Sequence, residues 1–214
     1  MKHNMGNENV NGASQLVFKY AAVFYIFIFL CFSVSLLKVA SVITIYAQQD
    51  KLTASDAAAG DRFGDSVSIS GDYAIVGAYA DASSQGSAYI FKRSGETWTE
   101  IKKLTASDAA AGDRFGDEVA ISGNYAIVGA YANADAGAFS GSAYVFYKDQ
   151  GGVDNWGEVK KLTASDAAAS DVFGFNVSID GEYAVVGAHQ NDDGGSLSGS
   201  AYVFYKDQGG VDNW

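Results

Sequence analysis

The chain has 214 residues with 25 Gly, no Pro and one Cys, and its formal net charge is −11 at pH 7. This acidity excludes nucleic acid as an expected partner, because phosphate binding needs a basic surface. A single cysteine excludes a disulfide framework and a thiolate metal cluster, and without proline the turns must be built from Gly, Asp, Asn and Ser.

The first segment, residues 1–47, is predicted to be a signal peptide or a signal anchor. A polar, basic start precedes an uncharged apolar run at residues 21–37. A secretory signal combines such a run with a small residue before the cleavage site, which Ala47 supplies. A membrane anchor needs about 20 apolar residues, so the run is short unless Lys38 extends towards the membrane surface. We favour a cleaved leader helix, and with either alternative the rest of the chain is secreted or displayed on the cell surface.

The remainder of the chain is one sequence unit written three times. The sequence KLTASDAAAGDRFGD begins at Lys51 and again at Lys103, and the variant KLTASDAAASDVFGF begins at Lys161. Repetition of this kind indicates an array of similar structural units. The units are repeat 1 at residues 51–102, repeat 2 at residues 103–160 and an incomplete repeat 3 at residues 161–214.

Each repeat is expected to form four short antiparallel strands. Hydrophobic residues recur with period two, which favours strands over helices. In repeat 1 the expected strands are residues 63–70, 73–80, 87–92 and 97–104, and turn-forming residues separate them. Four-stranded units repeated at this spacing are typical of β-propeller blades, so the predicted fold class is all-β.

Two further features of the repeats predict specific contacts. Gly77, Gly129 and Gly187 interrupt the second strands, which indicates close approach by a neighbouring backbone or side chain, and the preceding Phe ring is one candidate. Residues 51–53 have the pattern of a fourth strand without a blade of its own. Three blades leave open edges, and open edges favour self-association.

The repeats resemble a known family. Each contains a Phe-Gly pair, a Val-x-Ile segment and a Val-Gly-Ala segment, and these elements are similar to those of the FG-GAP repeat, found in the propeller of integrin α-subunits. The resemblance implies that the three blades belong to a larger propeller, usually of seven blades. The Pro of the family signature is replaced by Tyr79, Tyr131 and His189.

Calcium binding, which many family members perform in the loop between the first two strands, is not expected at that loop. The loop is a tight turn in each repeat, for example at residues 70–72, and calcium needs about 6–8 oxygen ligands. Weak calcium binding at Asp192 and Asp193 is the alternative to a simple turn-forming role for these residues. No other metal or cofactor is predicted.

No catalytic constellation is visible in the repeats. His189 is the only histidine beyond the leader, and it lacks the partners that a triad needs. No Gly-x-Ser-x-Gly, His-Glu-x-x-His or P-loop motif occurs. The sequence therefore predicts no catalytic residues and no enzymatic activity, and His189 is interpreted as a tolerated substitution at the end of a strand.

Candidate binding residues lie in the loops between the second and third strands, because these loops differ among the repeats. They are Asp81, Asn133, Asp135, Asn191, Asp192 and Asp193. We expect a non-catalytic, adhesion-type module that binds a protein or a glycan through these loops, and that meets a membrane only through an uncleaved leader. Two alternatives stay open: an accessory propeller fragment of a larger exported enzyme, and a truncated product without independent function.

Overall fold

A computed structural model describes residues 47–207 and Trp214. Residues Gln49–Trp214 form one compact unit. The predicted leader lies outside the described residues apart from Ala47, so its structure stays a prediction. Among the residues that are described, no helix is long and apolar enough to cross a membrane.

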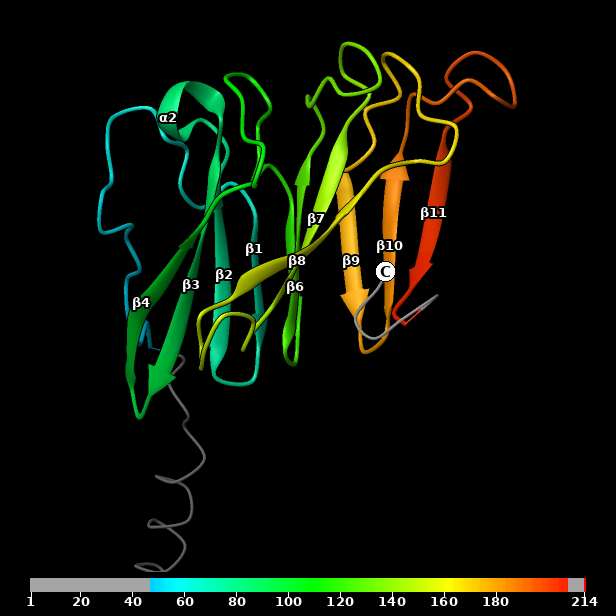
Figure 1. Ribbon diagram of the computed structural model, residues 1–214. Helices are drawn as coiled ribbons and strands as arrows, with labels where there is room; N and C mark the ends of the chain where they lie inside the picture. The colour runs from blue at the N-terminus through cyan, green and yellow to red at the C-terminus, as the bar shows by residue number, and fades with distance from the viewer. Residues whose placement is uncertain (1–46, 208–213) are drawn as a thin grey trace, which may run out of the picture. The chain divides into compact units, whose positions relative to one another are not determined.

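The described chain is all-β and forms three antiparallel sheets, one for each repeat, which we call blades 1, 2 and 3 (Figure 1). Blade 1 contains β1 (Val67–Ser70), β2 (Tyr73–Ala78), β3 (Ser87–Ser94) and β4 (Thr97–Leu104). Blade 2 contains β5 (Val119–Ser122), β6 (Tyr125–Ala130), β7 (Ser142–Tyr147) and β8 (Gly157–Leu162). Blade 3 contains β9 (Asn176–Asp180), β10 (Tyr183–Ala188) and β11 (Ser200–Tyr205). A short helical turn, α2 (Asp81–Ser84), lies in the loop between β2 and β3.

The strands form in sequence order within each blade, as expected for a meander. Neighbouring strands are hydrogen-bonded in the order β1-β2-β3-β4 in blade 1, and blade 2 repeats this order. The first turn is tight because Gly71 adopts a φ of 59°, a conformation that glycine tolerates best. One prediction is wrong: residues 51–53 have no regular secondary structure.

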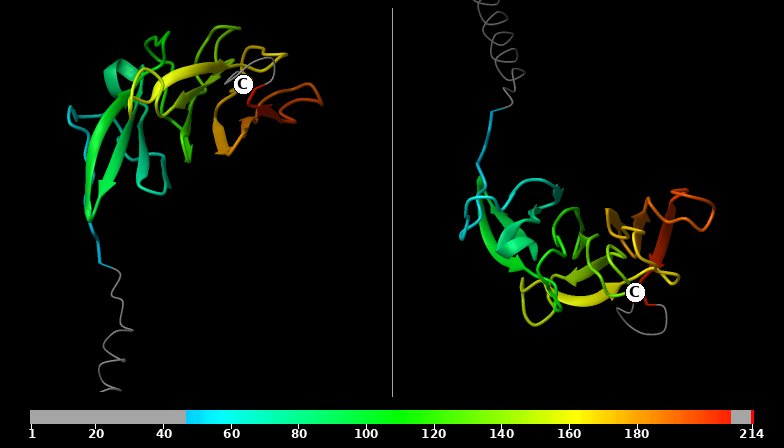
Figure 2. Two further views of the ribbon diagram at one scale, coloured as in Figure 1. Left: turned by 60° about the horizontal axis from the view of Figure 1, so that its bottom comes forward. Right: turned by 90° about the horizontal axis from the view of Figure 1, so that it is seen from above.

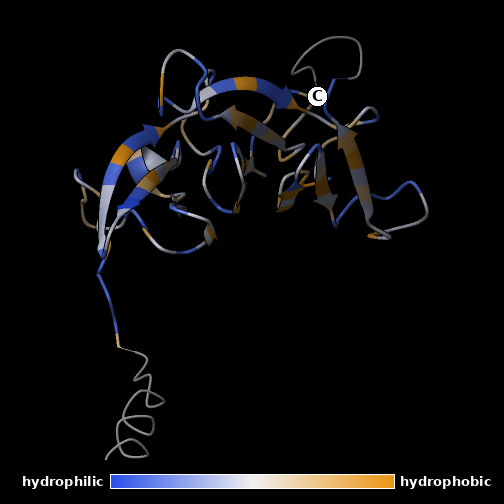
Figure 3. Cartoon of the chain, turned by 90° about the horizontal axis from the view of Figure 1, so that it is seen from below, coloured by the Kyte–Doolittle hydropathy of each residue, from blue (hydrophilic) through white to orange (hydrophobic). Residues whose placement is uncertain are grey.

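The three blades lie side by side along an arc, with β1, β5 and β9 as adjacent strands (Figure 2). The period-two pattern places alternate side chains in the layers between consecutive blades. Between blades 1 and 2, Ile75 and Ile90 pack with Val119 and Ile121. An equivalent cluster fills the layer between blades 2 and 3. Figure 3 shows the hydrophobic residues concentrated in the strands, whereas many connecting loops are hydrophilic.

The glycines inside the second strands permit the blades to approach closely. A Cβ atom built on Gly77 would lie 2.0 Å from the carbonyl oxygen of Gly116, and one built on Gly129 would lie 2.0 Å from that of Gly174. The predicted close approach is therefore confirmed at these two glycines, and the neighbour is the backbone of the next blade and not the Phe ring. The Phe rings pack within their own blade instead, where Phe115 contacts Tyr144 edge-on at a centroid distance of 5.5 Å.

The hairpin that ends blade 2 reaches back to blade 1. Trp156 is fully buried and packs edge-on against Tyr73, with ring centroids 5.5 Å apart. The hydroxyl of Tyr73 donates to Asp154 at 2.5 Å, and Lys92 Nζ donates to the same carboxylate at 2.6 Å. These contacts link the hairpin of blade 2 to β2 and β3 of blade 1, in addition to the apolar layer between the blades.

Candidate binding surface

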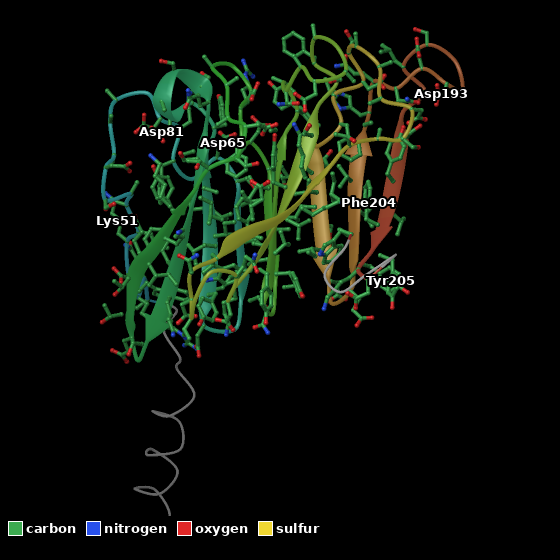
Figure 4. The ribbon with its side chains drawn as sticks, viewed as in Figure 1. Lys51, Asp65, Asp81, Asp193, Phe204 and Tyr205 are labelled. Atoms are coloured by element: carbon green, nitrogen blue, oxygen red, sulfur yellow. The ribbon has the colours of Figure 1, made fainter. Side chains whose placement is uncertain are left out.

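The candidate residues lie at one end of the blades, in the loops that connect β2 to β3, β6 to β7 and β10 to β11. Asp81 and Asp193 mark this end at the upper side of the view in Figure 4. The bases of two of these loops are fixed by the following blade. The amide of Phe115 donates to the carbonyl of Gln85 at 3.0 Å, and the amide of Phe173 donates to the carbonyl of Ser140 at 3.2 Å. These two loops are therefore held at their base by the next blade.

In blade 1, a lysine joins two loops at this end. Lys103 Nζ lies 2.6 Å from the carboxylates of both Asp56 and Asp81. The hydroxyl of Tyr89 donates to Asp56 at 2.8 Å, and burial raises the pKa of Tyr89 to about 12. Burial alone would raise the pKa of Asp81, but the hydrogen bonds from Lys103 and Ser87 outweigh it and hold this pKa below its usual value. Asp81 is thus a charged partner of Lys103 and not a free ligand.

Blade 2 repeats this arrangement with equivalent residues. Lys161 forms ion pairs with Asp108 and Asp135, and the hydroxyl of Tyr144 donates to Asp108 at 2.7 Å. Burial opposes the charge on Lys161, but its hydrogen bonds with the two carboxylates raise its pKa above the usual value. Asp135, a candidate binding residue, therefore serves to hold its loop against the loop before β5.

In blade 3 the same pair of carboxyl groups has no equivalent lysine among the described residues. Tyr202 donates its hydroxyl to Asp166 at 2.7 Å, as in the other blades. Asp193 lies beside Asp166, and the hydrogen bond between the two carboxyl groups raises the pKa of Asp193 above its usual value. The two acidic groups therefore face each other at a place where blades 1 and 2 hold an ammonium group.

Asn133 and Asn191 are buried and shape their loops from inside. Asn133 Oδ1 accepts from Ser142 Oγ at 3.0 Å and from the amide of Asp135 at 3.3 Å. Asn191 Oδ1 accepts from Ser200 Oγ at 2.8 Å and from the amide of Asp193 at 3.3 Å. Their burial assigns them a structural role, so these two candidates cannot contact a partner directly.

The exposed part of the loops includes two hydrophobic side chains that the sequence analysis missed. Phe139 is half exposed and Leu197 is 67% exposed, and Asp192 is exposed beside the pair formed by Asp166 and Asp193. Aligning the repeats would have found the two apolar residues, since both stand where repeat 1 has Ser84 in an otherwise polar loop.

A row of ring-bearing side chains crosses the three blades at the same ends of β2, β6 and β10. Arg114 lies over Tyr79 and Tyr131, with 5.6 Å and 5.3 Å between its guanidinium carbon and the ring centroids. Phe175 contacts Tyr131 at 5.4 Å and His189 at 4.5 Å between centroids. The residues that replace the family proline thus form one continuous row, and His189 belongs to it.

Metal binding finds little support in the described residues, which contain no group of three or more His, Cys, Asp or Glu side chains able to hold an ion. Asp166 and Asp193 offer two carboxyl groups, fewer than the about 6–8 oxygens that calcium takes. The weak calcium site expected at Asp192 and Asp193 therefore stays a prediction, and a calorimetric titration with millimolar calcium tests it.

Antiparallel meanders stacked through their faces define the chain as a repeat protein built of propeller-like blades. The family model of the FG-GAP repeat matches residues 46–91, 98–146 and 156–204. These matches span more than half of the chain, so it belongs to the FG-GAP repeat family, and the resemblance noted in the sequence is confirmed. A comparison with curated proteins finds no match.

Proposed function

We propose that the chain is a non-catalytic, extracellular binding module of the adhesion type, which contacts a protein or a glycan through the loops after β2, β6 and β10. The main observation behind this proposal is the exposure of Phe139, on a loop whose base is hydrogen-bonded to blade 3, and of Leu197, on the equivalent loop of blade 3, which is closed by its own backbone hydrogen bonds. Exposed apolar side chains on a supported loop are typical of a recognition surface, because they give contact area at low entropic cost.

The different roles of the candidate residues support this proposal. Four of them hold the loops in place, namely Asp81, Asp135, Asn133 and Asn191. Asp192 and the exposed Phe139 and Leu197 are then the side chains available to contact a partner. The family relationship adds support, since the FG-GAP repeat is the repeat of integrin α-subunits and those are cell-surface proteins. Export, through the leader at residues 1–47, and membership of a larger propeller belong to the same proposal.

The test is a binding assay of the full chain against immobilised extracellular-matrix proteins and a glycan panel. The variant carries Phe139→Ser and Leu197→Ser together. We expect at least a tenfold loss of affinity for whichever partner the unchanged chain binds, with an unaltered circular dichroism spectrum.

The matched control is Val153→Ser, which removes an apolar side chain that is 88% exposed in the hairpin between β7 and β8, at the opposite end of the blades. This control is expected to bind like the unchanged chain. An equal loss in the control variant, or no binding to any member of either panel, contradicts the proposed function.

A further inference from the structure

Blade 1 exposes the face with which the other blades pack against their predecessors. Val119 and Ile121 of β5 are buried against blade 1, and Val119 is only 3% exposed. The equivalent residues of β1 are Val67 and Ile69, and Val67 is 66% exposed. Exposed apolar residues gathered on one strand face often mark an interaction site, and the residues of this face resemble those of the buried layers between blades.

Blade 3 exposes the opposite, complementary face. In blade 2, Ile127 and Val145 are fully buried and contribute to the layer with blade 3. Their equivalents are Val185 and Val203, and Val203 is 67% exposed. Blade 1 and blade 3 therefore expose the two faces that pack together between blades 1 and 2 and again between blades 2 and 3.

Blade 3 also has, at Gly187, a socket for a backbone carbonyl that no described residue fills. Gly77 and Gly129 each receive a carbonyl oxygen from the next blade, from Gly116 and Gly174 respectively. A Cβ built on Gly187 would meet no atom closer than 3.6 Å, and that atom belongs to its own blade. Blade 3 is thus shaped to receive a Phe-Gly segment that no described part of this chain supplies.

The charges at the two ends are complementary as well. In blades 1 and 2 the lysine that begins the next repeat, Lys103 or Lys161, enters between two carboxylates. Blade 3 has the two carboxyl groups of Asp166 and Asp193 without such a lysine among the described residues. The lysine that begins repeat 1 is Lys51, which is exposed at the opposite end of the array (Figure 4).

The segment that follows Lys51 makes the same contacts as the equivalent segment of repeat 2. The amide and hydroxyl of Ser55 donate to Glu100 at 2.7 and 2.8 Å. The equivalent Ser107 donates to Glu158 at 2.9 and 2.8 Å. The segment that follows Lys51 is therefore anchored to its own blade in the same way as the segment that follows Lys103.

We propose that two copies of this chain associate head to tail, with blade 1 of one copy packed on blade 3 of the other. In this contact Lys51 enters between Asp166 and Asp193, and the carbonyl of Gly64 lies against Gly187. The interface is heterologous, so it leads to a ring if the rotation between copies closes.

The first test measures the mass of the full chain by light scattering in a mild detergent, because the apolar run at residues 21–37 must not drive association. The unchanged chain is expected at the mass of two or more copies. Gly187→Ala is expected at the mass of one copy, since its new methyl group occupies the socket while contacting its own blade only at ordinary distances. Val67→Asp, which places a charge on the exposed face of blade 1, is expected to have the same effect.

The matched control is Gly194→Ala, which introduces the residue that blade 2 already has at the equivalent position, Ala136. This variant is expected to associate like the unchanged chain. Mixing the Gly187→Ala and Val67→Asp proteins distinguishes a head-to-tail contact, between blade 1 and blade 3, from a symmetric contact between two identical faces. Each variant keeps the face that the other lacks, so the equimolar mixture regains a two-copy species.

A carbodiimide, which joins carboxyl groups to amines in direct contact, tests the ion pair. The unchanged chain is expected to give a covalent dimer containing a peptide pair linked through Lys51 and Asp166 or Asp193. Lys51→Arg keeps the charge and the association but removes the coupled amine, so its covalent dimer is lost. Three results overturn the proposal: a single-copy mass for the unchanged chain, unaltered association of Gly187→Ala, or a mixture that stays monomeric. With the first result, further blades of a longer chain would be the expected partners of the two exposed faces.

Discussion

Asp117 shows how the contact between two blades acts on one carboxyl group. It lies at the start of blade 2, where partial burial, followed by the neighbouring charge of Asp65, raises its pKa to about 6. A carboxyl group with a raised pKa binds a proton more readily in the folded than in the unfolded chain. Its contribution to stability is therefore lost as the pH rises from about 4 through about 6.

Replacing Asp117 by Asn is expected to stabilise the protein at pH 7 by about 1 kcal/mol, a value reduced for the exposure of the group to solvent. The gain is expected to vanish at pH 4, where the carboxyl group is already protonated in the folded chain. Urea unfolding at both pH values measures the difference. Asp192→Asn, which removes the same charge from an exposed loop, serves as the control; a gain that is equal at the two pH values contradicts the account.

Gly129→Ala is expected to destabilise the fold by about 3 kcal/mol, because the added Cβ would lie 2.0 Å from a backbone carbonyl that cannot move without separating blades 2 and 3. Thermal unfolding followed by circular dichroism measures the loss. Gly194→Ala adds the same methyl group in a loop, and its melting temperature is expected to stay close to that of the unchanged chain. A similar melting temperature for both variants would show that no close backbone approach exists at Gly129.

At the scale of elements, the hairpin between β7 and β8 is fixed to blade 1 by the carboxylate of Asp154. Asp154→Ala removes the bonds to Tyr73 and Lys92 but leaves the buried Trp156 in place. We expect faster amide hydrogen exchange in residues 149–155, with a change in global stability below about 1 kcal/mol. Unchanged exchange in this hairpin, measured by mass spectrometry, would contradict its attachment to blade 1.

The strands could be predicted from the sequence because their signal is local. Period-two hydrophobic residues and Gly-centred turns placed all four strands of blade 1, and β4 coincides with the expected range of residues 97–104. The sequence left open whether a backbone or a Phe ring approaches Gly77, and the state of residues 51–53 was predicted wrongly. Both depend on which blade lies next to them, and that contact is set by residues far away in the sequence.

For the candidate site, the sequence predicted the location in the loops but not which residues are exposed and which are structural. The variable loops were found from their differing sequences, but polarity alone does not distinguish a ligand from a structural group. Asn133 was selected because it lies in a variable loop, and the structure shows that it is buried. Leu197 was overlooked because it is apolar, although it is among the more exposed side chains of that surface.

At the scale of the whole molecule, the array of blades explains both proposals. One end carries the loops whose exposed tips are proposed to meet a partner, and the two outermost faces are proposed to meet a second copy. Both proposals rest on the same claim, that consecutive blades pack through a repeated arrangement of strand faces in which a glycine of one blade receives a backbone carbonyl of the next.

An experimental density map of the chain tests this central claim most directly. The account predicts the carbonyl oxygen of Gly116 against Gly77 and that of Gly174 against Gly129, with Val119 buried between blades 1 and 2. A map in which the sheets are separated, or pack through other strand faces, would contradict it.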